Sequence, residues 1–142
     1  MYSVYFGNGK AYFSDYPEFC EDVFTFGFDR ISVHAGPHPD DILIRCTIIQ
    51  LISDFLYKHT DKALFFVCDS VDKRGISRMR LFERWCRINK IPHLEKHNTS
   101  ILSPDMELYA SIMLHGDHPL KDYVIRSFHH LSRNTAEKLK SY

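Results

Sequence analysis

Four charged residues stand close together near the middle of the chain: Asp69, Asp72, Arg74 and Arg78. On a helix the two arginines lie on one side and extend back toward the turn that holds the aspartates. Arginines that meet at a helix N-terminus can bind a phosphate or another anion. The aspartates can equally cap the helix and pair with the arginines, and we favour this structural interpretation because a buried arginine needs such a partner. Arg78 is therefore predicted to be largely buried and to reach Asp69 or Asp72.

A strand and a helix must position this cluster. Residues 63–68 are apolar without alternation, which is typical of a strand buried on both faces. Residues 74–89 follow with helical spacing. The stripe of this helix that should face the core contains Leu81, Phe82, Trp85, Ile88 and Arg78. The sequence thus predicts a strand–turn–helix unit with the charged cluster at its joint.

The same helix is strongly basic, although the whole chain is neutral. Eighteen Lys and Arg residues balance eighteen Asp and Glu residues, so no net field draws the chain to nucleic acid or to an anionic membrane. Within residues 72–90, however, seven basic residues accompany two acidic ones. Arginines beside Phe82 and Trp85 suit phosphates and bases. Because both aromatic residues share the apolar stripe, we favour a solvated basic face and keep a nucleic-acid binder as an alternative.

Nine histidines raise the question of a metal site. His34 and His38 are four residues apart, as are His93 and His97, but this spacing brings two rings together only on a helix. Prolines interrupt the first pair, and the second falls in a predicted strand, where residues four apart are separated by roughly 13 Å. No HExxH pattern or cysteine pair is present, so we expect no metal site.

The cysteines indicate a reduced protein. Cys20, Cys46, Cys68 and Cys86 are widely separated in apolar or amphipathic stretches, where a free thiol behaves as a small hydrophobic group. No signal segment is evident and no apolar run is long enough to span a bilayer. We therefore expect a cytoplasmic protein without a membrane partner.

The chain is predicted to form a single domain over residues 1–142, of the α/β (mixed α+β) class with one mixed sheet. The element order is β-β-β-α-β-α-β-β-α. Its elements are residues 2–6 and 11–13 around a Gly-Asn-Gly turn, 23–28, 40–59, 63–68, 74–89, 93–101, 106–114 and a final helix from Pro119. Residues 106–114 also carry helix signals and are assigned to a strand because residues 93–101 need a sequence neighbour.

This element order resembles the core of the GCN5-related N-acyltransferase fold over residues 2 to 114. Residues 81–84, Leu-Phe-Glu-Arg, stand where such enzymes often have a Leu-Tyr-Glu-Lys sequence. The resemblance implies an acyl-CoA cofactor. The family holds the CoA pyrophosphate on a glycine-rich loop that precedes the first core helix. The corresponding loop of this chain contains Gly36 and His38.

The chain departs from that family pattern at two positions. Pro37 and Pro39 remove two backbone N–H donors from the loop. Phe82 stands in place of the tyrosine that commonly protonates the leaving thiolate, so the resemblance implies the fold and leaves the activity open. The stretch from Cys68 to Arg74, with Arg78, Phe82 and Trp85, also resembles an uncharacterised family of small bacterial proteins.

Three functions therefore follow as expectations. The first is an acyl-CoA N-acyltransferase-like protein, and the second is a non-catalytic module that binds a protein or a small anion. The third is a nucleic-acid binder that uses the basic helix. The candidate anion- or CoA-binding residues are Gly36, His38, Asp69, Asp72, Arg74 and Arg78.

Overall fold

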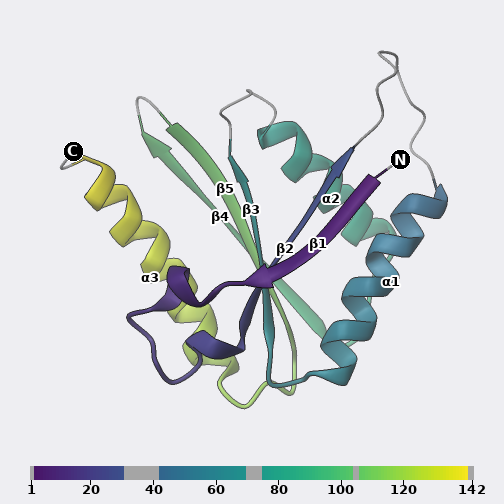
Figure 1. Cartoon of the computed structure of the whole chain (residues 1–142), viewed down its shortest axis with the longest axis horizontal. Helices are drawn as coiled ribbons and strands as arrows, with labels where there is room; N and C mark the ends of the chain where they lie inside the picture. The colour runs from purple at the N-terminus through teal and green to yellow at the C-terminus, as the bar shows by residue number, and fades with distance from the viewer. Residues whose placement is uncertain (1, 31–41, 70–74, 104–105, 141–142) are drawn as a thin grey trace.

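A five-stranded mixed sheet in the order β1-β2-β3-β5-β4 lies at the centre of the computed structural model, which describes residues 2–30, 42–69, 75–103 and 106–140 (Figure 1). The strands are β1 (Tyr2–Asn8), β2 (Val23–Arg30), β3 (Ala63–Asp69), β4 (Leu94–Ser103) and β5 (Met106–His115). β3 is the middle strand, parallel to β2 and antiparallel to β5. The outer pairs, β1–β2 and β4–β5, are antiparallel. The predicted mixed sheet and its central strand are confirmed.

Helices cover both faces of the sheet. They are α1 (Ile42–Lys58), α2 (Gly75–Ile88) and α3 (Lys121–Lys140), with two short 3₁₀ helices, η1 (Lys10–Phe13) and η2 (Cys20–Asp22). α1 and α2 pack together on one face, and α3 packs on the opposite face beside η1 and η2 (Figure 1). We call these the α1/α2 face and the α3 face. The three predicted helices and their role in covering the sheet are confirmed.

The apolar run of β3 explains this three-layer arrangement. Leu64, Phe66 and Cys68 are buried on the α1/α2 face, while Ala63 and Phe65 are buried on the α3 face. Successive side chains of a strand point to opposite faces, so a strand without polar residues needs a cover on each side. Burial of each large apolar side chain contributes roughly 1.5–3 kcal/mol, which drives both layers onto the sheet.

The two parallel strands diverge after a short paired segment. Only Val23, Phe24 and Thr25 of β2 are in register with β3, where their partners are residues 63–65. Both strands continue beyond this point, β2 to Arg30 and β3 to Asp69. Figure 1 shows β2 leaving with β1 while β3 stays beside β5. We call residues 26–30 and 66–69 the splay.

Two sequence expectations are wrong. The predicted strand at residues 11–13 is the 3₁₀ helix η1, because Phe13 buries itself against Phe65 of the sheet, with ring centroids 5.3 Å apart, instead of pairing with β1. β1 pairs with β2 instead, so the early hairpin does not form. Ile88 is 54 % exposed, because it lies in the last turn of α2, beyond the layer that the rest of its stripe contacts.

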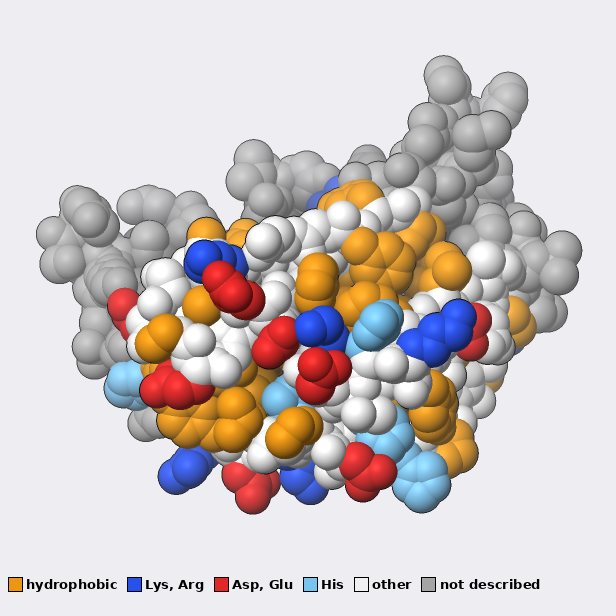
Figure 2. Space-filling view, turned by 60° about the horizontal axis from the view of Figure 1, so that its bottom comes forward, with side chains coloured by type: hydrophobic (Ala, Val, Ile, Leu, Met, Phe, Trp, Pro, Cys, Tyr) orange, Lys and Arg blue, Asp and Glu red, His pale blue; other side chains and the backbone are white. Residues whose placement is uncertain are grey.

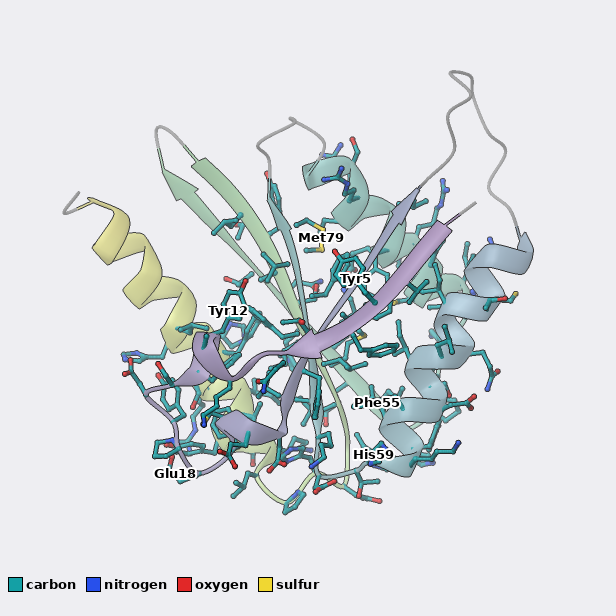
Figure 3. All side chains as sticks on the ribbon, in the orientation of Figure 1. Tyr5, Tyr12, Glu18, Phe55, His59 and Met79 are labelled. Atoms are coloured by element: carbon teal, nitrogen blue, oxygen red, sulfur yellow. The ribbon has the colours of Figure 1, made fainter. Side chains whose placement is uncertain are left out.

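The predicted strand at residues 106–114 and the predicted helix before β3 agree with the structure. The strand assignment of residues 106–114 is confirmed, since β5 pairs with both β3 and β4. The apolar side of α1 packs on the sheet and on β1, and Phe55 points from α1 toward the strands (Figure 3). The Phe55 ring stacks on that of Phe6, with centroids 5.6 Å apart. Over the described part of the chain, no helix is long and apolar enough to cross a membrane.

Candidate functional site

Four of the six candidate anion- or CoA-binding residues lie outside the described residues. Gly36, His38, Asp72 and Arg74 fall in the segments 31–41 and 70–74, and Asp69 is described only as the last residue of β3. Arg78 lies in the first half of α2 and its side chain is partly buried, whereas Arg84 and Arg87 are exposed. The grouping of these residues around an anion, or around each other, stays a prediction.

Three aromatic rings pack at the base of the splay, on the α1/α2 face. Phe26 of β2 and Phe66 of β3 directly follow the last registered pair, and their ring centroids are 5.9 Å apart. Phe82 of α2 lies 4.7 Å from Phe66 and 6.0 Å from Phe26. All three rings are at most 3 % exposed. Phe82 thus joins α2 to both diverging strands and is part of the core, as its place on the apolar stripe predicted.

A polar network lies behind Phe82, between α2, β4 and β5, and it runs from a buried hydroxyl to an exposed side chain, that of Asn98. Ser111 of β5 is fully buried, and its hydroxyl donates a hydrogen bond to Asn98 Oδ1 at 2.6 Å. Asn98 in turn donates to Glu83 Oε1 of α2 at 2.6 Å. Lys96 Nζ donates to Asn98 Oδ1 at 2.6 Å and forms an ion pair with Glu83. This network, which we call the Lys96 network, fixes α2 against the β4–β5 hairpin.

The ammonium group of Lys96 is unusually well shielded from water. Its side chain is only 14 % exposed, and Nζ lies 5.5 Å from the centre of the Phe82 ring. Burial lowers the pKa of Lys96 from its usual 10.5 to about 8, because desolvation disfavours the charged form. The Glu83 carboxylate and the ring face of Phe82 both favour the ammonium ion and offset part of that cost.

The Lys96 network was missed by sequence reasoning. The signal was present but weak: Lys96 and Asn98 alternate with Glu95 and His97 along β4, so two polar residues must point to each face. The register places Lys96 opposite Met113 and Asn98 opposite Ser111. Glu95 points to the α3 face instead, where it pairs with Lys121 at 3.0 Å. A partner on α2 could not be assigned without knowing how that helix crosses the sheet.

Five of the histidines that the structure describes make ring contacts or accept hydrogen bonds within the fold. His93 and His97 of the predicted strand pair diverge, since His93 stacks with His115 and His97 meets His129 of α3. His115 Nδ1 accepts a hydrogen bond from the backbone N–H of Asp117 at 3.0 Å. His118 Nδ1 accepts one from the backbone N–H of Leu120 at 2.9 Å. Burial lowers the pKa of His118, which favours its neutral form as an acceptor.

Within the described ranges, no group of three or more His, Cys, Asp or Glu side chains could hold a metal ion. The four cysteines are free thiols. Cys20 and Cys68 are buried in the two core clusters, and Cys86 is partly buried. On the end of the molecule that Figure 2 brings forward, acidic, basic and histidine side chains alternate without forming a patch of one sign.

The basic helix presents its charges and not its aromatic rings to solvent. Arg80, Arg84 and Arg87 are exposed on α2, while Phe82 and Trp85 are at most 1 % exposed. The expectation that both aromatic residues belong to the core is confirmed. Stacking of nucleic-acid bases on them would require α2 to leave the sheet.

The comparison with known proteins gives a family. Residues 40–130 match the family of unknown function DUF6169, which covers more than half of the chain. The chain belongs to this family. Its matched part runs from just before α1 to the middle of α3, and so contains every residue of the Lys96 network, while β1 and β2 precede it. Membership of an uncharacterised family is thus confirmed. Neither a curated protein nor a solved structure matches the chain.

Proposed function

We propose that this protein binds an acyl-CoA thioester along the splay, as a member of the acyl-CoA N-acyltransferase-like folds. The observation that carries the proposal is the divergence of β2 and β3 after three registered pairs. When two parallel strands diverge, their backbone N–H and C=O groups face the space between them without partners from the other strand. Such a pair resembles an exposed sheet edge. A ligand with amide groups of its own can pair with such edges, as an added strand would.

The chemistry of CoA suits this arrangement. Its pantetheine arm carries two amide groups, which can exchange hydrogen bonds with the diverging backbones. In the sequence, the segment that contains Gly36 and His38 follows β2, and the segment that contains Asp72 and Arg74 follows β3. Both segments thus leave from the same end of the parallel pair, where we propose that they contact the phosphates.

The proposal covers binding of the thioester and assigns no catalytic acid. Phe82 has no proton to transfer, and its ring is fully buried between Phe66 and Lys96. Transfer of the acyl group would need a proton for the leaving thiolate. A protein that binds acetyl-CoA without releasing CoA would match the first function expected from the sequence, an acyltransferase-like fold whose activity was left open.

A thermal-shift titration with acetyl-CoA tests the proposal. A ligand present at 100 times its Kd stabilises the folded state by about 2.7 kcal/mol, so the midpoint should rise by several degrees. Val67→Trp is the blocking variant, because Val67 is a partly buried splay residue on the α3 face. Ile88→Trp, at an exposed position, is the matched control. No shift with wild-type protein at millimolar acetyl-CoA would refute the proposal, as would an equal shift in Val67→Trp.

The exposed arginines of α2 favour one further candidate function, nucleic-acid binding through Arg80, Arg84 and Arg87. Binding of this kind depends on phosphate contacts and weakens steeply as salt rises. Oligonucleotide binding measured between 50 and 200 mM salt distinguishes it from acyl-CoA binding. Affinity that stays constant over this range would exclude phosphate contacts as its basis.

A further inference from the structure

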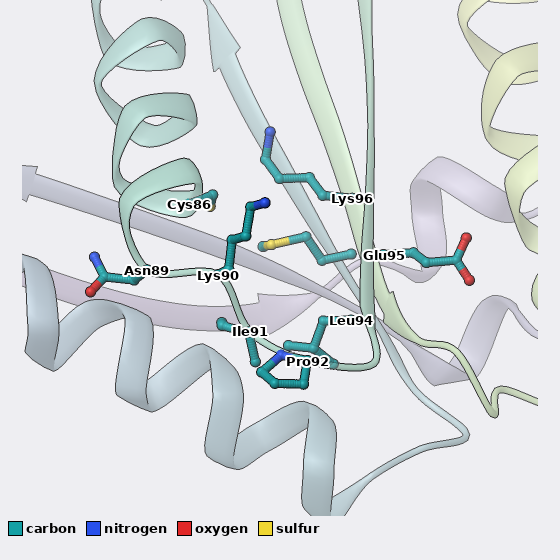
Figure 4. A pocket seen from close by; sticks show the side chains of 9 residues that line it. Cys86, Asn89, Lys90, Ile91, Pro92, Leu94, Glu95 and Lys96 are labelled. Carbon is teal, nitrogen blue, oxygen red and sulfur yellow. The ribbon is translucent and has the colours of Figure 1, made fainter.

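A cavity lies away from the splay, where α2 ends and β4 begins. It has a volume of about 460 Å³, a size typical of small-molecule sites. The last turn of α2, the connection at residues 91–92, β4 and Met113 of β5 form its walls (Figure 4). Its residues come from none of the splay segments, so a ligand here would not occupy the proposed acyl-CoA site.

Most of the cavity wall is apolar and uncharged. Leu94, Ile91 and Cys86 are partly buried, and Met113 is 4 % exposed. Burial raises the pKa of the Cys86 thiol to about 12, so this side chain stays neutral and acts as an apolar surface. Such a wall favours the hydrocarbon part of a ligand through removal of apolar surface from water.

Positive charge lines one side of the cavity. Lys90 and Lys96 extend toward the side on which Cys86 lies, whereas Glu95 points away to the opposite face of the sheet (Figure 4). Lys90 is exposed, and no carboxylate of the described residues pairs with it. Lys96 uses two of its three N–H donors for Asn98 and Glu83. The local excess of charge is therefore positive, and it comes from Lys90.

The walls of the cavity are held in place before any ligand arrives. Asn89 binds the Trp85 carbonyl oxygen through its backbone N–H at 3.0 Å and through Nδ2 at 3.1 Å, which closes the end of α2. The Tyr57 hydroxyl of α1 donates to the Pro92 carbonyl oxygen. The Gly116 N–H donates to the His93 carbonyl oxygen at 2.7 Å. A preformed apolar site with few polar groups loses little conformational entropy on binding.

We propose that this cavity binds a small organic monocarboxylate with an apolar body, of the class of medium-chain fatty acids. The hydrocarbon part lies against Leu94, Met113 and Cys86, and the carboxylate pairs with Lys90 at the rim. A neutral ligand of the same length forms no ion pair with Lys90 and should bind more weakly, and a cationic ligand is repelled by the Lys90 ammonium group. The anion is thus selected by charge and the chain by the apolar wall.

Decanoate is the probe that tests this site. Trp85, the only tryptophan, precedes Cys86 in α2, so its fluorescence reports binding, with isothermal titration calorimetry as an independent readout. We expect one decanoate per chain, with 1-decanol binding more weakly. Lys90→Gln should weaken decanoate binding by about fivefold, the value of one exposed ion pair, and leave 1-decanol unchanged. Lys58→Gln, at an exposed position at the end of α1, should change neither.

A filling variant separates the apolar wall from the charge. Cys86→Phe should abolish decanoate binding, whereas Cys46→Phe, at an exposed position, should retain it. The far-UV circular dichroism of each variant shows whether it is folded. If Cys86→Phe is unfolded, the decanoate affinity of Lys90→Gln tests the proposal instead. Absence of decanoate binding at 1 mM would overturn the proposal, as would equal affinities for decanoate and 1-decanol. Because the acetyl-CoA titration uses another site, either proposal can fail without the other.

Discussion

The buried ammonium group of Lys96 should make the stability of the protein depend on alkaline pH. Its pKa falls from 10.5 to about 8 on folding, so between these values the unfolded chain binds more protons than the folded one. The free energy of unfolding must then rise with pH over that range. Each pKa unit corresponds to 1.36 kcal/mol, which gives a gain of about 3 kcal/mol from pH 8 to 10.5. This is an upper bound, because the Glu83 carboxylate favours the charged form.

Urea denaturation of wild type and Lys96→Met at pH 7, 8, 9 and 10 measures this effect. Other lysines, tyrosines and thiols also titrate in this window, so the quantity of interest is the difference between the two proteins. We expect wild type to gain stability relative to Lys96→Met as the pH rises. Lys58→Met is the control, because the exposed Lys58 side chain should leave the wild-type slope intact. Parallel pH profiles for wild type and Lys96→Met would refute the conclusion that desolvation governs Lys96.

Three further substitutions test the packing around α2. Ser111→Ala should cost about 1 kcal/mol in urea denaturation, since Asn98 Oδ1 keeps its bond to Lys96; a loss above about 3 kcal/mol would mean that the network depends on Ser111. Phe82→Ala should cost roughly 3–5 kcal/mol because the ring is fully buried, and an unchanged urea midpoint would contradict the packing at the base of the splay. Arg78→Ala is expected to cost roughly 3–5 kcal/mol if it pairs with a buried aspartate, against less than about 1 kcal/mol for the exposed Arg84→Ala; equal midpoints would show that the predicted cluster is not structural.

Regular apolar patterns made much of the fold predictable. The unbroken run in β3 identified a strand buried on both faces, and the stripe of α2 identified Phe82 and Trp85 as core residues. The strand prediction for the segment around Phe13 was wrong because a Gly-Asn-Gly turn favours a hairpin locally. Burial of Phe13 against Phe65 outweighed that local preference. Local turn chemistry cannot report which distant surface a ring will contact.

The candidate sites were harder to predict for a geometrical reason. The Lys96 network joins Glu83, Lys96 and Ser111, which come from three separate elements. No spacing rule links them, since their contact depends on how α2 crosses the β4–β5 hairpin. The splay depends on where pairing between β2 and β3 stops, which is a property of the sheet twist and not of either strand alone. The Asp/Arg cluster could be proposed from the sequence because residues four apart, such as Arg74 and Arg78, lie on one side of a helix, and it stays a prediction.

Backbone amide chemical shifts, followed by NMR during a titration with acetyl-CoA, test the proposed acyl-CoA site most directly. Binding along the splay predicts saturable shifts of the amide signals of residues 26–30 and 66–69, with small effects on the edge strand β4. Val67→Trp should suppress these shifts, whereas Ile88→Trp should retain them. Unchanged spectra at millimolar acetyl-CoA, or shifts confined to residues outside β2 and β3, would contradict acyl-CoA binding between the diverging strands.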